Sequence, residues 1–235
     1  GLRVSSAPIV AFIDDDCTAS SKWIKSLIAA FSRNKGAWAV EGKTVTKGPI
    51  GPFSHYIINN NGGMFMTCNM AFRKKRLLEA GRFDERFKHA NREDADVAFS
   101  ILEKGGKISF CKSAVVCHAY LRSSFFRELR KKTYYMWDIL LAKKHSKLYT
   151  KNIKVPLERF TPLYILFWIL AWFQIYFLIG LVFVSMAELL YRKYSFGIVD
   201  FIRFLFLQSI GSFIVVASAI YGMIKFRFNP VNLLR

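Results

Sequence analysis

The chain has 235 residues, enough for one ordinary domain with an addition or for two small domains. It carries 35 basic and 16 acidic residues, a formal net charge of +19, and 53% of its residues are hydrophobic. So positive a balance indicates a nucleic acid, a membrane surface or an anionic substrate as partner. The four cysteines form no CxxC pair, which argues against the common zinc sites and indicates reduced thiols in a chain that faces the cytosol.

Three consecutive carboxylates, Asp14, Asp15 and Asp16, directly follow the apolar run at residues 9–13. A short apolar run predicts a strand buried on both faces, as in a parallel sheet. Open α/β sheets place their ligands at the carboxyl ends of such strands. Adjacent negative charges repel one another unless a cation or solvent relieves them. The pattern predicts a divalent-cation site, and the alternative is a solvated acidic turn.

The next segments alternate between helix and strand patterns. Helical spacing of apolar residues predicts an amphipathic helix over 20–34, and residues 37–46 are expected to form a strand. Residues 47–63 are rich in Gly, Pro and Asn and are expected to form a loop. A short basic helix over 74–80 is expected to end at Gly81.

A second acidic group, Glu93, Asp94 and Asp96, opens a helix expected over 92–104. Acidic residues in the first turn stabilise a helix through its dipole, so a capping role is one explanation. Three carboxylates within four residues are more than capping requires. A functional role is therefore the second explanation, and the sequence pattern leaves both open.

Two short strands are expected over 107–110 and 114–117, and the second places His118 at its end. A single histidine in such a position is more often structural than a metal ligand. Cys111, Cys117 and His118 are the closest approach to a cluster of soft ligands, but their spacing lacks the two close pairs of a zinc site.

The segment 124–141 combines aromatic and basic residues. Phe126, Leu129 and Trp137 fall roughly on one face of a helix, and arginines and lysines are interspersed among them. Such a helix is typical of a membrane interface. An ordinary surface helix packed on the domain is the alternative.

Two segments, 163–187 with 25 residues and 204–224 with 21, contain no Asp, Glu, Lys, Arg or His. Because about 20 apolar residues span a bilayer, they predict two transmembrane helices joined by residues 188–203. The basic segments 131–159 and 225–235 favour the cytoplasmic side. We therefore expect an integral protein of the plasma or inner membrane whose N-terminal part is cytoplasmic. Membrane lipid then accounts for the positive charge, and no nucleic-acid partner is expected.

Five blocks follow one another along the chain. They are AFIDDD at 11–16, TCNMAFR at 67–73, GRFDERF at 81–87, EDADV at 93–97 and VVCH at 115–118. In this order they resemble the DxD, GxNxAFR, GGFDExF, ED-x-DL and strand-then-histidine motifs of the family 2 glycosyltransferases. The resemblance implies an α/β fold of the GT-A type, the Rossmann-like fold of nucleotide-diphospho-sugar transferases.

The same resemblance implies a domain plan. Residues 1–120 would form the C-terminal part of the catalytic domain, 121–162 a basic interface segment, 163–226 two transmembrane helices and 227–235 a cytoplasmic tail. Family members carry a nucleotide-gripping strand and loop before the DxD. Because these would precede Gly1, we expect this chain to be a piece of a longer protein and inactive alone.

The resemblance also assigns roles to the first acidic block. Asp14 and Asp16 would hold Mg²⁺ or Mn²⁺ against the diphosphate of a nucleotide sugar, since hard cations prefer oxygen ligands. Mn²⁺ also tolerates imidazole, which makes His118 a candidate third ligand. Asp15 would contact the sugar or the ribose.

The second acidic block would supply the proton chemistry. By resemblance, Asp94 is the general base that takes a proton from the acceptor hydroxyl, and neighbouring Glu93 belongs to the same catalytic group. A single base-assisted displacement implies inversion at the anomeric carbon. The remaining positions expected to bind donor or acceptor are Asn69, Arg73, Asp84 and Asp96.

The expected function is the transfer of a sugar from a nucleotide-sugar donor to a lipid-linked or saccharide acceptor at the cytoplasmic membrane face. Residues 127–131 lack the QxxRW motif of processive synthases, so transfer of a single sugar is expected. Two alternatives remain. A haloacid-dehalogenase-like phosphatase would use Asp14, Asp16 and Thr18 as a DxDxT motif, and a non-enzymatic membrane scaffold would only bind a cation or a partner.

Overall fold

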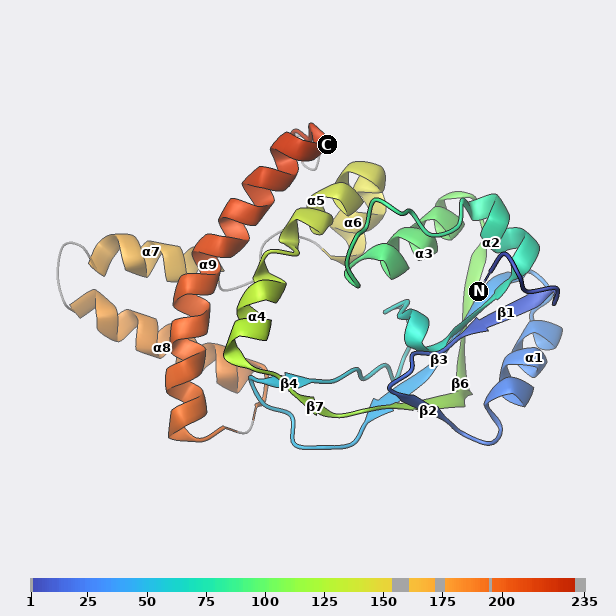
Figure 1. Cartoon of the computed structure of the whole chain (residues 1–235), viewed down its shortest axis with the longest axis horizontal. Coiled ribbons are helices and arrows are strands. Elements are labelled where there is room, and N and C mark those ends of the chain that lie inside the picture. Colours follow the sequence, from blue (N-terminus) through green and yellow to red (C-terminus); the bar gives the residue numbers. More distant parts are fainter. Residues whose placement is uncertain (1, 154–160, 172–175, 195, 231–235) are drawn as a thin grey trace. The chain divides into compact units, whose positions relative to one another are not determined.

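The computed structural model consists of two compact units (Figure 1). The first unit comprises Gly1–Gly48 and Tyr56–Tyr120, and the second comprises Pro49–His55 and Leu121–Arg235. The structure describes residues 2–153, 161–171, 176–194 and 196–230. Residues 154–160 of the predicted interface segment lie outside the described residues, as do residues 231–235 of the predicted tail.

The first unit is built on a five-stranded mixed sheet with the strand order β1-β5-β3-β6-β2. The long strands β3 and β6 pair in parallel, and the other neighbours pair antiparallel. The strands are β1 (Ile9–Phe12), β2 (Cys17–Ala19), β3 (Ala37–Thr46), β5 (Met70–Arg73) and β6 (Lys107–His118). This α/β arrangement agrees with the expected fold class.

Helices cover both faces of this sheet. On one face, α1 (Trp23–Arg33) packs Leu27 and Phe31 against buried strand residues such as Val40. On the other face, α2 (Lys74–Ala80) and α3 (Glu93–Glu103) cover Ala39, Met70 and Phe72 with apolar side chains. The three helices confirm those predicted over 20–34, 74–80 and 92–104, and α2 ends at Gly81, whose φ of 108° suits a residue without a Cβ.

Two strand predictions were wrong in detail. Strand β1 is an edge strand that pairs antiparallel with β5, and it is half-buried along its length, whereas a fully buried parallel strand was expected. The two strands expected over 107–110 and 114–117 form the single strand β6. A register shift opposite Gly42 and Lys43 lets β6 continue through the polar residues Lys112 and Ser113.

The second unit is mainly helical, with a short two-stranded antiparallel sheet, β4 (Ser54–His55) and β7 (Leu121–Arg122). Its helices are α4 (Phe125–Lys132), α5 (Tyr135–Lys144), α6 (Ser146–Asn152), α7 (Thr161–Ala171), α8 (Tyr176–Tyr191) and α9 (Ile198–Phe226).

The helix expected over 124–141 is interrupted between α4 and α5. Ser218 of α9 accounts for the break, because its hydroxyl donates to the carbonyl of Thr133 at 2.6 Å and accepts from the N–H of Met136 at 2.9 Å. The carbonyl of Thr133 and the N–H of Met136 are therefore paired with a side chain of α9 and do not continue the helix from α4 into α5.

Helix α9 contains the second predicted span. It has 29 residues and a mean hydropathy of 1.9 in its most apolar part. Within the described ranges, it is the one helix that is long and apolar enough to cross a membrane, judged by length and composition.

The first predicted span, residues 163–187, is not one straight helix. The hydroxyl of Tyr164 in α7 lies 3.0 Å from the hydroxyl of Ser185 in α8, although the two are 21 positions apart. A straight helix would separate them by about 30 Å. Helices α7 and α8 therefore lie side by side, as Figure 1 shows, and residues 172–175 between them lie outside the described residues.

Polar groups are concentrated inside this helical unit. Lys132 donates to Gln208 at 2.8 Å, Gln208 donates to Glu188 at 2.9 Å, and Glu188 also accepts from Arg192 and Tyr164. The exposed face of α9 is apolar instead and presents Ile202, Phe206, Ile210, Phe213, Ile220 and Ile224. Paired polar groups buried among apolar side chains, with an apolar outer face on α9, are the distribution expected of helices surrounded by lipid.

Candidate active site

Strand register brings the two acidic blocks to the same end of neighbouring strands. Phe12 at the end of β1 pairs with Met70 at the start of β5. Residues after Phe12 and residues before Met70 therefore lie at the same end of this strand pair. The first group includes Asp14. The second is the 3-10 turn Thr67–Asn69, and Thr67 bonds to Asp94 at the start of α3.

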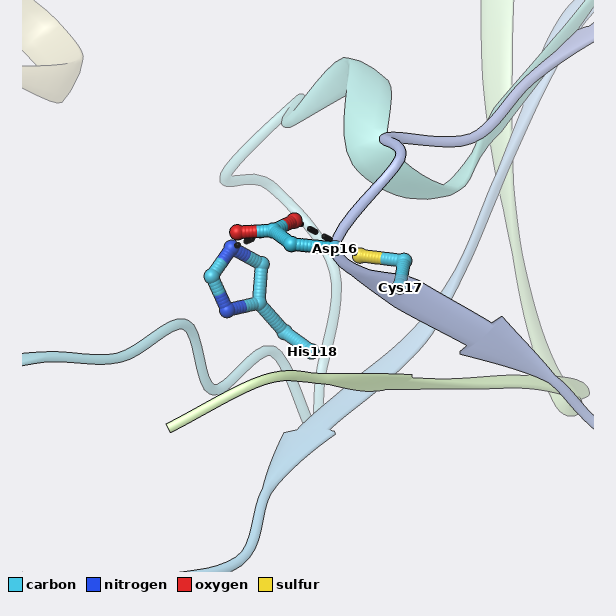
Figure 2. Close-up of side chains that lie close together, drawn as sticks. All are labelled: Asp16, Cys17 and His118. Carbon is cyan, nitrogen blue, oxygen red and sulfur yellow. Dashed lines mark hydrogen bonds and ion pairs between the residues drawn. The ribbon is translucent and has the colours of Figure 1, made fainter. Parts of the chain in front are cut away.

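The pairing of β2 with β6 places His118 beside the first acidic block. Cys17 pairs with His118, and the N–H of Ala119 donates to the carbonyl of Asp16 at 2.9 Å. Figure 2 shows the carboxylate of Asp16 between the imidazole of His118 and the thiol of Cys17. The His118 Nε2 lies 3.5 Å from Asp16 Oδ1, and the Cys17 Sγ lies 3.8 Å from the same oxygen.

These three side chains carry donor atoms that could bind a metal ion. One potential ligand atom from each of Asp16, Cys17 and His118 lies within 4.8 Å of the others. Nδ1 of His118 lies 2.8 Å from the carbonyl oxygen of Ala119, which can only accept, so Nδ1 donates there while Nε2 faces Asp16. A carboxylate with a neutral imidazole fits Mn²⁺, whereas Mg²⁺ prefers oxygen alone.

Without a bound cation, the thiol of Cys17 stays protonated at neutral pH. Burial, with the negative charges of Asp16 and Asp14, raises the pKa of its thiol to about 11. The thiolate is the form that binds metals, and it is rare so far below the pKa.

The other two aspartates of the block are exposed. Asp14 is outside the group of three potential ligand atoms, although it is electrostatically coupled to Asp16 and His118. Desolvation, then the charge of Asp16, raises the pKa of Asp14. A cation that engaged both Asp14 and Asp16 would relieve this repulsion.

Asp94 is held in a fixed orientation by Thr67. The Thr67 N–H donates to Asp94 Oδ2 at 3.0 Å, and the Thr67 hydroxyl donates to Oδ1 at 2.7 Å. Burial raises the pKa of Asp94, the two bonds from Thr67 oppose that rise, and the charge of Asp14 adds to it. The influence of Asp14 shows that the two acidic blocks share one electrostatic environment.

Glu93 is the most strongly perturbed carboxyl group of the site. Burial, followed by the charge of Asp94, raises the pKa of Glu93 to about 7. Its Oε2 is buried and has no hydrogen-bond partner within the described part of the chain. A proton on Glu93 near neutral pH avoids an unpaired buried charge.

Asn69 was expected to contact donor or acceptor, and that role stays a prediction. Its side chain is 1% exposed and is used inside the domain. It accepts from the indole of Trp23 at 2.8 Å and donates to the carbonyls of Lys43 and Ala114 at 2.9 and 3.0 Å. A Cβ on Gly42 would lie 2.3 Å from the Asn69 Oδ1, so glycine there makes room for the amide.

Arg73 was also expected near the sugar, and this stays a prediction; it lies at the end of β5 that is farther from the acidic blocks. It pairs with Ile9 at the start of β1, three positions before Phe12, or about 10 Å from that end of the strand. Its guanidinium donates to the carbonyls of Ala37 and Phe31 and stacks on the Phe31 ring. Arg73 therefore joins α1 to the sheet.

Asp84 and Asp96 both interact with Arg86. Asp84 accepts from the Arg86 guanidinium at 2.6 and 3.0 Å, which raises the pKa of Arg86. Asp96 is 1% exposed and lies within electrostatic range of Arg86, and its expected role in substrate binding stays a prediction. A binding role for Asp84 stays a prediction.

Glu41 of β3 is a further buried carboxylate that the sequence did not single out. Its side chain accepts from the amide of Asn59 and from the backbone N–H groups of Gly63, Met64 and Phe65. These four bonds fix the end of the glycine-rich loop ahead of Thr67. The sequence also assigned no role to Thr67, although Thr67 is the first residue of the TCNMAFR motif at 67–73.

The fold and this site together define a class: an α/β sugar-transferase domain of the GT-A type. A comparison with protein families agrees. The family model described as "Glycosyl transferase family group 2" matches residues 53–226, well over half of the chain, and the chain belongs to this family. The matched range contains Thr67, Asp94 and His118, and it begins after Asp14 and Asp16.

A curated relative was also found. A glucosyl-dolichyl phosphate glucuronosyltransferase from Haloferax volcanii is 29% identical over 140 residues, which cover 50% of this chain and 45% of the relative. The matched part thus spans about half the length of that relative.

Proposed function

We propose that the protein transfers a sugar from a nucleotide-sugar donor to a lipid-linked saccharide, with inversion at the anomeric carbon and assistance from Mn²⁺ or Mg²⁺. The observation that carries the proposal is the alignment of Asp94 by Thr67 in the same electrostatic environment as Asp14. Membership of a glycosyltransferase family supports this reading over the phosphatase and scaffold alternatives.

Asp94 is the proposed general base. Its raised pKa brings its basicity closer to neutral pH, which improves proton transfer. As the acceptor oxygen forms its bond to the anomeric carbon, the bond from that carbon to the diphosphate breaks, and the hydroxyl proton passes to Asp94. Thr67 keeps the carboxylate in position, and protonated Glu93 avoids a second negative charge beside it.

Asp16 and His118, with Asp14, are the residues that would hold the cation. A bound Mn²⁺ or Mg²⁺ would neutralise charge on the departing nucleoside diphosphate. Exposed Asp15 is proposed to contact the ribose or the sugar.

The membrane is the proposed location of this reaction. Support comes from the length of α9, its apolar exposed face and the paired polar groups buried in the helical unit. The substrate named for the Haloferax relative is itself a lipid-linked sugar, which favours a lipid-linked acceptor here. The basic segment 131–159, which precedes α9, favours a cytoplasmic catalytic unit.

The test uses the intact protein in membranes, a panel of nucleotide sugars and Mn²⁺, and measures release of the nucleoside diphosphate. We expect release from one donor, a fall of at least about a thousandfold in Asp94→Asn, and donor binding that is retained in that variant. Glu79→Gln removes a carboxylate of the exposed Arg76–Glu79 ion pair and is the matched control. Activity that survives in Asp94→Asn would reject the assigned base.

A further inference from the structure

Two sets of hydrogen bonds attach the segment 59–69 to strand β3, one on each side of Thr67. Before Thr67, the side chain of Glu41 accepts from backbone N–H groups of the segment. After Thr67, the side chain of Asn69 donates to the carbonyl of Lys43 at 2.9 Å. Glu41 and Lys43 are two positions apart in β3, so Thr67 is held between two points of one strand.

The carboxylate of Glu41 is the centre of the first set. The residue is 2% exposed, and it accepts from the side-chain amide of Asn59 at 2.7 Å. It also accepts from the backbone N–H groups of Gly63, Met64 and Phe65 at 2.6, 3.1 and 2.5 Å. Both oxygens of a carboxylate are acceptors, so one side chain satisfies all four donors, whereas an amide would offer one oxygen to them.

The backbone that Glu41 holds has an unfavourable conformation. Phe65 has a φ of 60°, in the left-handed region that a bulky residue rarely adopts, and Met64 beside it is 46% exposed. The Phe65 ring meets the ring of Phe99 in α3 edge to face, with centroids 6.2 Å apart, which positions the ring. The bonds to Glu41 stabilise the strained backbone itself.

The hold on Phe65 reaches the proposed base through Thr67. Because Phe65 precedes Thr67 by two positions, fixing its N–H limits how far the backbone of Thr67 can move. The N–H and the hydroxyl of Thr67 donate to different oxygens of Asp94, so both bonds require Thr67 in one place. A misplacement of about 1 Å in an active site can lower the rate about a hundredfold.

We propose that Glu41 is a positioning residue for sugar transfer, whose carboxylate holds the 63–65 backbone so that Thr67 keeps Asp94 aligned. This role rests on the proposed function, because Asp94 acts as the base only if the protein transfers a sugar. The alternative is a purely structural role, in which Glu41 stabilises the fold without acting through Thr67. The two roles differ in whether the loss of Glu41 still matters once Thr67 has lost its hydroxyl.

The first measurement is a double-mutant cycle of Glu41→Gln and Thr67→Val in the intact protein in membranes, followed by release of the nucleoside diphosphate. We expect Glu41→Gln to lower kcat about tenfold and to change the donor KM less than about twofold. When Thr67 is already valine, Glu41→Gln should lower kcat less than about threefold, since only the backbone bond to Asp94 is left to lose. Glu79→Gln at an exposed ion pair is the matched control. An equal loss in both backgrounds would overturn the proposal.

The second measurement does not depend on activity. Hydrogen exchange at residue resolution, on the intact protein in nanodiscs without substrate, follows the Thr67 N–H that donates to Asp94. We expect this N–H to exchange about tenfold faster in Glu41→Gln, while the N–H groups inside α3 keep their rates. An unchanged rate at Thr67 would overturn the proposal, and so would an equal acceleration throughout α3, which would indicate a loosened fold.

A milder variant decides the outcome if Glu41→Gln does not fold. Asn59→Ala removes one donor to Glu41 and leaves the carboxylate with its three backbone bonds. We expect kcat to fall and the Thr67 N–H to exchange faster, each by about two- to threefold. A variant in which neither quantity changes would overturn the proposal.

Positioning and transfer can fail separately. If no donor releases a nucleoside diphosphate but the Thr67 N–H exchanges faster in Glu41→Gln, the proposed function fails while the hold of Glu41 on Thr67 stands. If transfer occurs and exchange at Thr67 is unchanged in Glu41→Gln, the inference fails while the function stands.

Discussion

Thr67 makes two hydrogen bonds to one carboxylate, that of Asp94, which lies 27 positions further along the chain. The backbone N–H donates to Oδ2 at 3.0 Å and the hydroxyl to Oδ1 at 2.7 Å. Both bonds stabilise the charged form of Asp94 and oppose the effect of burial on its pKa. Thr67 therefore sets both the orientation and the basicity of the proposed base.

Replacing Thr67 by valine tests this relationship. We expect kcat to fall about ten- to a hundredfold with little change in KM for the donor, because the base loses its alignment. Loss of a bond that lowers the pKa of Asp94 should also move the acid limb of the pH–kcat profile to higher pH. Thr67→Ser should restore both quantities, and Thr150→Val in α6 is the control for loss of a threonine hydroxyl. A reduced kcat with an unmoved acid limb would contradict a positioning role.

Replacing His118 by glutamine tests the metal site. We expect the Mn²⁺ concentration for half-maximal activation to rise about ten- to a hundredfold, since an imidazole ligand is lost. Cys17→Ser should change that concentration less than about threefold, because the Cys17 thiol, with a pKa of about 11, is protonated at neutral pH. His55→Gln in the helical unit is the control. Metal activation that depends on Cys17 and not on His118 would show that the ligand assignment is wrong.

Replacing Glu93 by glutamine should stabilise the protein in a pH-dependent way. Its pKa is about 7 in the folded state and 4.5 ordinarily, so the folded state binds more protons between these values and stability falls as pH rises from 4.5 to 7. Glu93→Gln removes this loss, which amounts to on the order of 1 kcal/mol above pH 7 after allowance for solvent screening. Thermal unfolding at pH 5 and pH 8 measures the difference, with Glu103→Gln at the other end of α3 as control. A variant no more stable than the wild type at pH 8 would contradict the raised pKa.

Replacing Glu41 by glutamine should loosen the glycine-rich loop before Thr67. The new amide would face N–H groups of Gly63, Met64 and Phe65 that need an acceptor. We expect a loss of about 2–4 kcal/mol in unfolding free energy, measured by urea titration, and faster proteolysis within residues 59–65. Glu79→Gln, at an exposed ion pair, should cost less than about 1 kcal/mol. Unchanged protection of the loop would show that backbone packing holds it without Glu41.

Local sequence patterns predicted the elements whose formation depends on neighbouring residues. Helices α1, α2 and α3, strand β3 and the long helix α9 follow from apolar spacing and glycine positions. The prediction of one span over 163–187 failed because Tyr164 and Ser185 meet only when the chain folds back. Apolar composition is the same in a straight helix and in two packed helices, so it cannot distinguish them.

The candidate site likewise has features that the sequence predicted and features that only the tertiary structure decided. The sequence by itself determined which carboxylates are present, their order, and the resemblance of their motifs to one glycosyltransferase family. Only the tertiary structure decided that Asp16 meets His118, that Thr67 aligns Asp94, and that Asn69 and Arg73 make hydrogen bonds within the domain. The physical reason is that strand register, burial and hydrogen-bond partners arise between segments far apart in the chain, and no local periodicity records them.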